Sequence, residues 1–110
     1  MQISKLQKNN ITIFRILDQV DMYCVKDLRE SLEDTLDSGK AKIVINIENL
    51  DYIDSSGIAL LYSFNQKLIE KGHKLRLVVN QNKTMLLSHF SVEKHIPLFF
   101  KEDNALNSFL

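Results

Sequence analysis

The sequence has few of the residues that cross-link, break or charge a protein chain. Among 110 residues it has one cysteine, one proline, three glycines and no tryptophan. A single cysteine cannot form an intramolecular disulfide, and this scarcity is typical of a reducing compartment. The 14 basic and 14 acidic residues give a formal net charge of zero. This balance argues against a nucleic acid or an anionic membrane as partner, because such binding depends on a basic excess.

Long apolar runs are missing as well. The first eight residues lack the apolar segment of a signal peptide, and no run approaches the roughly 20 apolar residues that span a membrane. We therefore expect a cytoplasmic protein with no membrane partner. The hydrophobic fraction of 45% and the charged fraction of 25% are ordinary for a globular protein. A chain of this length favours one domain, residues 1–110, with its own core.

Strand and helix patterns alternate along the chain. β-branched and aromatic residues predict strands over 11–17, 43–47 and 75–79, and the 43–47 run is apolar enough to be covered on both faces. Apolar residues three and four positions apart predict helices over 25–36 and from 55 onward, with shorter helices near 85–90 and after 103. This alternation indicates an α/β domain whose sheet is partly parallel.

The connecting segments carry more local signals. Asn9 and Asn10 suit a tight hairpin between residues 2–8 and the first of these strands, because asparagine tolerates positive φ. Pro97 makes 96–100 a short edge strand, since proline cannot donate to a central ladder. We expect a loop over residues 48–54 and an N-cap at Asp103 for the last helix. We also expect Met85, Leu86 and Leu87 to be buried in the core.

The segment Asp54-Ser55-Ser56-Gly57-Ile58 opens the second predicted helix. Its first three residues could each cap the helix, but one suffices, and neither serine is followed three residues later by the Glu or Gln of a capping box. Gly57 lowers helix propensity by about 1 kcal/mol relative to alanine. A glycine there is useful where another molecule must approach the backbone. The serine hydroxyls are therefore less committed to structure than usual.

A phosphate on one of these serines would be tolerated by the helix, because a helix N-terminus carries partial positive charge and free N–H donors. It would place about two negative charges close to Asp51 and Asp54, which is costly for an acidic or apolar partner. This is the chemistry of a phosphorylatable docking site. The plainer interpretation, a redundant cap and a tight turn, stays open on these residues alone.

Other catalytic and binding constellations have little support. A serine hydrolase needs G-x-S-x-G with a base and an acid, whereas neither serine has a glycine two residues before it and nothing ties His73, His89 or His95 to Ser55. One cysteine and three scattered histidines are a poor set of metal ligands. No glycine-rich phosphate-binding motif is present. We expect no metal, no cofactor and no catalytic activity, with Cys24 as a half-buried structural residue.

The order of elements, with Asp54-Ser55-Ser56-Gly57-Ile58 after the second long strand, resembles the STAS domain and more closely the stand-alone bacterial anti-sigma factor antagonists. In that family the first serine of a D-S-[ST]-G-[IL] motif is phosphorylated, which implies that Ser55 is the phosphoacceptor. Segment 19–24 resembles the family's approach to its first helix. Asp21 there matches an acidic residue near the site, and Cys24 stands where a small polar residue is common. Residues 99–106 resemble the family's ending.

The resemblance implies a STAS-like α/β domain with a mixed sheet of about four to five strands packed against about four helices. It also implies a partner-binding surface around the phosphoacceptor, made by Asp21, Asp54, Ser56, Gly57 and Ile58. Tyr52, just before the motif, is the best further candidate for this surface, and a ring packed under the loop is its alternative.

The implied function is that of an anti-sigma factor antagonist. The dephosphorylated protein would bind an anti-sigma factor that is also a serine kinase, and so release a sigma factor. Phosphorylation of Ser55 would break this binding, and a serine phosphatase would reset it. We expect a monomer. Two alternatives stay open, a structural STAS module that is never phosphorylated and a small hydrolase that uses Ser55.

Overall fold

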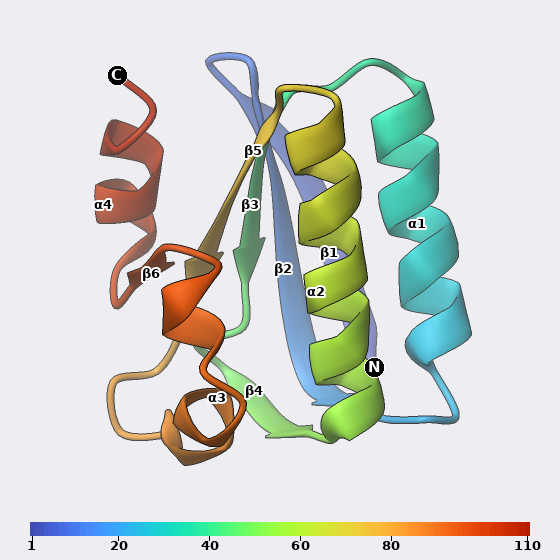
Figure 1. Cartoon of the computed structure of the whole chain (residues 1–110), viewed down its shortest axis with the longest axis vertical. Helices are drawn as coiled ribbons and strands as arrows, with labels where there is room; N and C mark the ends of the chain where they lie inside the picture. The colour runs from blue at the N-terminus through green and yellow to red at the C-terminus, as the bar shows by residue number, and fades with distance from the viewer.

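The computed structural model describes all 110 residues, as a six-stranded sheet with helices on both faces (Figure 1). The strands are β1 (Gln2–Lys8), β2 (Ile11–Val20), β3 (Lys42–Asn46), β4 (Leu50–Ile53), β5 (Lys74–Val78) and β6 (Leu98–Phe99). The helices are α1 (Val25–Asp37), α2 (Ser55–Glu70), α3 (Met85–His89) and α4 (Glu102–Asn107), with a short 3₁₀ turn at Val92–Lys94. The predicted α/β class is confirmed.

The main sheet runs in the order β1-β2-β3-β5-β6. β1 pairs antiparallel with β2, and the other neighbours are parallel, so the prediction of a partly parallel sheet is also confirmed. Asn9 and Asn10 form the predicted hairpin turn with φ of 52° and 69°. β6 lies at the edge of the sheet, directly after Pro97, as predicted.

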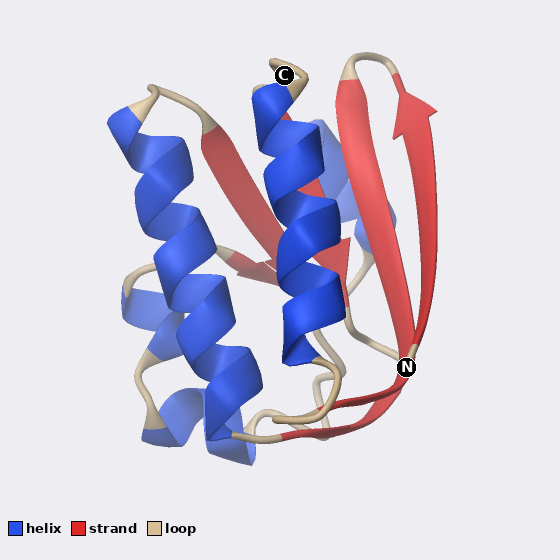
Figure 2. Cartoon of the chain, turned by 90° about the vertical axis from the view of Figure 1, so that its right-hand side faces the viewer, coloured by secondary structure: helices blue, strands red, loops and turns tan.

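Different helices cover the two faces of the sheet. α1 and α2 lie side by side on one face, whereas α4 lies on the other (Figure 1 and Figure 2). Alternate residues of β3 divide between these layers. Ile43 and Ile45 belong to the larger core with α1 and α2, and Val44 belongs to a smaller cluster with Ala105 of α4. The continuous apolar run in this strand therefore reflects burial on both faces.

Residues 48–54 do not form the loop that we expected, because β4 occupies most of the segment. β2 has ten residues, and β3 pairs only with residues 11–15 of it. The far end of β2 pairs in parallel with β4, and the register shifts between Asp18, whose φ is +72°, and Gln19. This short strand pairs the end of β2 and fixes the position of the residues just before α2.

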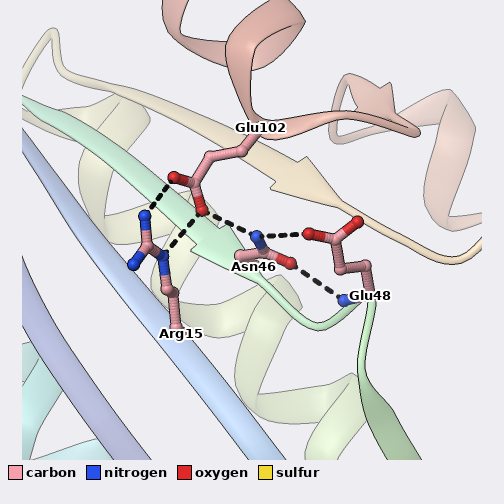
Figure 3. A network of polar contacts seen from close by, with 4 residues as sticks. All are labelled: Arg15, Asn46, Glu48 and Glu102. Atoms are coloured by element: carbon pink, nitrogen blue, oxygen red, sulfur yellow. Dashed lines mark hydrogen bonds and ion pairs between the residues drawn. The ribbon is translucent and has the colours of Figure 1, made fainter.

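A polar network fastens α4 to the sheet (Figure 3). Arg15 of β2 donates two hydrogen bonds to the Glu102 carboxylate, at 2.6 and 3.0 Å, and the buried Asn46 at the end of β3 donates a third at 2.7 Å. Asn46 also donates to Glu48 at 3.1 Å and accepts from the backbone N–H of Glu48 at 2.9 Å. The hydrogen bonds from Arg15, with a smaller contribution from Asn46 and against the effect of burial, hold the pKa of Glu102 below its ordinary value.

Two local predictions are wrong. Asp103 does not cap the last helix, because α4 begins one residue earlier, at Glu102, with Lys101 as N-cap and no side-chain cap bond. The side chain of Glu102 is engaged with the sheet, so the first turn of α4 is anchored from outside the helix. Met85 is not a core residue, since 87% of it is exposed, whereas Leu87 is buried.

Candidate functional site

The predicted motif lies where β4 ends and α2 begins, and Asp54 is the N-cap of that helix. Its Oδ1 atom accepts hydrogen bonds from the backbone N–H groups of Ser56 at 3.0 Å and Gly57 at 3.2 Å. The hydroxyl of Ser56 donates to the same oxygen. The cap is therefore a single aspartate, and Ser56 is tied to it through both its backbone and its side chain.

The other carboxylate oxygen of Asp54 connects two segments that are distant in sequence. Its Oδ2 atom accepts from the backbone N–H of Met22 at 3.1 Å, and its own backbone N–H donates to the carbonyl of Val20 at 3.1 Å. The hydrogen bond from the Ser56 hydroxyl is the largest effect that lowers the pKa of Asp54. Partial burial raises this pKa, and the backbone N–H groups of Gly57, Met22 and Ser56 lower it further. Asp54 is therefore held as a carboxylate at neutral pH.

Ser55 is the first residue of α2 and is exposed to solvent. Its hydroxyl makes no hydrogen bond within the chain, in contrast to the hydroxyl of Ser56. Because Asp54 supplies the cap, the Ser55 side chain is left without a structural task. The structure thus separates the two neighbouring serines into one committed and one free hydroxyl.

Asp21 lies in the turn that leads into α1, next to Met22. Its Oδ1 atom accepts from the backbone N–H of Tyr23 at 2.9 Å, and its backbone N–H donates to Sγ of Cys24 at 3.3 Å. Cys24 is the N-cap of α1 and is half-buried, but its side chain makes no cap bond. Asp21 therefore stabilises the turn before α1, and the Met22 N–H in this turn donates to Asp54.

Gly57 and Ile58, both predicted to contact a partner, lie beneath the surface. Ile58 is 2% exposed and belongs to the main core, so its side chain offers no contact area. A Cβ at Gly57 would lie 2.7 Å from Cγ1 of Ile53 and 2.9 Å from Cγ1 of Val20. The close approach that this glycine permits is that of the chain's own β2 and β4, and the structure gives both residues a packing role.

Three large apolar side chains are exposed around this site. Tyr52 of β4 is 57% exposed, so the alternative of a ring packed under the loop is wrong. Met22 and Tyr23, in the turn that contacts Asp54, are 66% and 88% exposed. Sequence reasoning did not single out Met22; its position between an aspartate and a tyrosine, in a connection between elements, was the available signal.

Two of the three histidines pack against aromatic rings away from the motif. The ring of His95 packs edge-on against Tyr62 and that of His89 against Phe90, with centroids 5.2 and 5.1 Å apart. No hydrogen bond joins a histidine to Ser55. No group of three or more His, Cys, Asp or Glu residues is placed to hold a metal ion. None of the four helices has both the length and the apolar character of a membrane span.

Known proteins share both the sequence pattern and the fold. The STAS domain model matches residues 2–105. The "Anti-sigma F factor antagonist" of Paenibacillus polymyxa is 24% identical over 108 residues, covering 96% of this chain and 92% of the relative.

Two solved structures superpose over nearly the whole chain. A putative anti-sigma factor antagonist from Thermotoga maritima gives a TM-score of 0.90 at 15% identity, covering 96% of this chain and 92% of that one. The Bacillus cell fate determinant SpoIIAA in its phosphorylated form gives 0.77 at 18% identity, covering 99% of this chain and 100% of that one. At such identities these two structures establish a shared fold.

Proposed function

The chain belongs to the STAS domain family, and on that premise we propose that it is an anti-sigma factor antagonist switched by phosphorylation of Ser55. In its unphosphorylated form it binds an anti-sigma factor that is also a serine kinase, and so releases a sigma factor. Phosphorylation of Ser55 ends this binding, and a serine phosphatase restores it. We propose residues 1–110 as one cytoplasmic binding domain with no catalysis of its own.

The free hydroxyl of Ser55 is the observation that carries this proposal. A kinase needs an accessible oxygen, and Ser55 is exposed and unbonded at the start of α2. Ser56, one residue later, is half-buried, and its hydroxyl already donates a hydrogen bond to Asp54. The geometry therefore favours Ser55 over its neighbour as the phosphoacceptor.

The Asp54 cap determines where a phosphate on Ser55 would lie. The N–H groups of Ser56 and Gly57, which would otherwise attract an anion, are occupied by Asp54. A phosphate on Ser55 thus stays on the surface beside the Asp54 carboxylate, where it adds about two negative charges. The helix keeps its cap, and only the surface that a partner meets is changed.

The proposed docking surface joins the α1 turn to the start of α2. We assign Asp21, Asp54, Ser56 and Tyr52 to it from the sequence, and we add Met22 and Tyr23 for their exposed apolar area. Aromatic and methionine side chains are enriched in the cores of protein interfaces. A dianion placed among them makes the same surface costly to desolvate against an apolar partner.

Incubation with ATP and a co-encoded kinase-like protein tests the proposal, with the phosphate mapped by mass spectrometry. We expect one phosphate, on Ser55, which is lost in Ser55→Ala and retained in the matched control Ser56→Ala. Ser55→Ala should bind the anti-sigma factor with the affinity of the unphosphorylated natural protein. Ser55→Asp should bind the anti-sigma factor at least tenfold more weakly. A phosphate on Ser56, or an unchanged affinity of Ser55→Asp for its kinase, would contradict the switch.

A further inference from the structure

A cavity of about 510 Å³ lies between β4, α3 and the residues that follow β3 and β5. Its volume falls within the roughly 300 to 1,000 Å³ of small-molecule sites. It opens at the carboxyl ends of parallel strands, which is the usual side for ligands in α/β sheets. Most of its wall is apolar, including Ile47, Leu50, Val79 and Leu86. Ser55, the proposed phosphoacceptor, does not line it, whereas Tyr52 of the proposed docking surface does.

The polar part of the wall comes mainly from one turn. Asn80 and Lys83 belong to the turn after β5, which is closed by a hydrogen bond from the Lys83 N–H to the Asn80 carbonyl at 3.0 Å. Oδ1 of Asn80 accepts from the backbone N–H of Asn82 at 2.8 Å, so the amide NH₂ group remains as a donor. The Lys83 ammonium is in neither of the ion pairs of the structure. Two unused donors thus adjoin an apolar cavity.

We propose that this cavity binds an amphipathic monocarboxylate, with its aliphatic chain among the apolar residues and its carboxylate on Lys83 and Asn80. A carboxylate matches one ammonium and one amide donor through charge-assisted hydrogen bonds. Asp51, the acidic residue of the lining, comes from β4 and not from the turn that carries Asn80 and Lys83. Its charge disfavours a ligand with a second negative group, such as a phosphate ester.

One residue of the cavity wall, Ile53, also packs against the first turn of α2. Ile53 lines the cavity, and it is also the residue whose Cγ1 lies closest to the position of a Cβ on Gly57. A ligand chain that packs against Ile53 restrains the residue immediately before the Asp54 cap. Binding itself requires no kinase and does not rest on the proposed function.

Titration of the complete chain with hexanoate, octanoate and decanoate, below their micelle concentrations, tests the proposal by NMR of the backbone amides. We expect saturable shifts concentrated in residues 47–53 and 79–87. Affinity should rise about fourfold for each added methylene group, as expected for burial of the chain. Octanol should bind the same residues without depending on Lys83.

Variants separate the two parts of the ligand. Lys83→Gln should weaken octanoate about tenfold and leave octanol unchanged, whereas the matched control Lys71→Gln, at the far end of α2, should change neither. Leu86→Trp, which fills the cavity, should abolish the binding of both, with the amide spectrum verifying the fold.

Shifts that do not saturate, shifts scattered over the surface, or equal losses in Lys83→Gln and Lys71→Gln would overturn the proposal. It is also overturned if no carboxylate binds while Leu86→Trp weakens the binding of a protein partner, because the cavity is then a docking pocket for a protein side chain.

Discussion

The backbone N–H of Met22 donates to the Oδ2 atom of Asp54 at 3.1 Å, across 32 positions of the sequence. The same carboxylate caps α2 and holds the hydroxyl of Ser56. One side chain therefore sets the relative position of the turn before α1 and the start of α2. These are the two segments that form the proposed docking surface, so its shape depends on the charge and reach of Asp54.

Replacement of Asp54 should reveal both its capping and its charge. Asp54→Ala should lower the free energy of unfolding by about 1 to 2 kcal/mol, the usual cost of a lost N-cap. Asp54→Asn keeps a capping oxygen and should cost less at pH 7. Denaturant unfolding of the three proteins measures these differences.

The pH dependence of that cost follows from the lowered pKa of Asp54. A carboxyl whose pKa is lower in the folded state stabilises the fold above its ordinary pKa of about 4, and this contribution is lost as the pH falls through the folded-state value. The difference in stability between the natural protein and Asp54→Asn should thus be constant from pH 7 to about 5 and shrink below pH 4. A difference that grows on acidification would contradict the assigned direction.

The two serines should differ in stability as they differ in bonding. Ser56→Ala removes the donor to the Asp54 carboxylate and should lower the free energy of unfolding by about 1 kcal/mol. Ser55→Ala removes no hydrogen bond and should change it by less than about 0.5 kcal/mol. Thermal or urea unfolding of both variants measures the contrast, and an equal loss in the two would show that Ser55 has a structural partner.

Gly57→Ala should destabilise the protein, although alanine is the better helix former by about 1 kcal/mol. The new methyl group would lie within 3 Å of Ile53 and Val20, and such overpacking costs about 1 to 3 kcal/mol. In an Ile53→Ala background the penalty should shrink, because the closest atom is gone. Gly72→Ala is the control, because Gly72 has φ of +73° and open space around it. This variant measures the cost of backbone strain without any overpacking. A stabilising Gly57→Ala would contradict the close packing.

Asn46→Asp should disrupt the network that holds α4. The amide donates to Glu48 and Glu102, so a carboxylate in its place faces two acidic groups and loses both hydrogen bonds. We expect a loss of about 2 to 3 kcal/mol at pH 7. The introduced carboxyl has a raised pKa in the folded state, so protonation on acidification should relieve part of the loss. Unfolding at pH 7 and pH 5 checks both statements, and a loss independent of pH would contradict the repulsion.

Local patterns were sufficient to predict most of the fold. The hairpin at Asn9 and Asn10 and the edge strand after Pro97 each follow from the conformational preference of one or two residues. β4 could not be predicted in this way. It pairs with the part of β2 that extends beyond β3, with a register shift between Asp18 and Gln19.

Long-range contacts also explain what the sequence left open at the site. The hydrogen bond from the Met22 N–H to Asp54 joins residues 32 positions apart, and the pattern of neither segment indicates it. The role of Gly57 depends on Val20, which is far away in sequence but adjacent in space. The start of α4 at Glu102 depends in the same way on Arg15. Each of these assignments needed the positions of two segments at once.

The exposed apolar residues near Ser55 should dominate the affinity for the protein partner. Interface energy concentrates in a few large side chains, and truncation of such a residue costs about 2 kcal/mol or more, which is about 30-fold in affinity. Tyr23→Ala and Tyr52→Ala should therefore each weaken binding to the anti-sigma factor about 30-fold. Because both rings are largely exposed, neither change should alter the free energy of unfolding by more than about 0.5 kcal/mol.

Ile69→Ala supplies the matched control for this prediction. Ile69 is 55% exposed, much like Tyr52, but it lies near the other end of α2, on the order of 20 Å from Ser55 along the helix. Calorimetric titration of the unphosphorylated variants with the partner should show full affinity for Ile69→Ala. Equal losses at positions 23, 52 and 69 would mean that the partner does not distinguish the start of α2 from its end. Phosphorylation of Ser55 could then not act by changing the surface on which the partner docks.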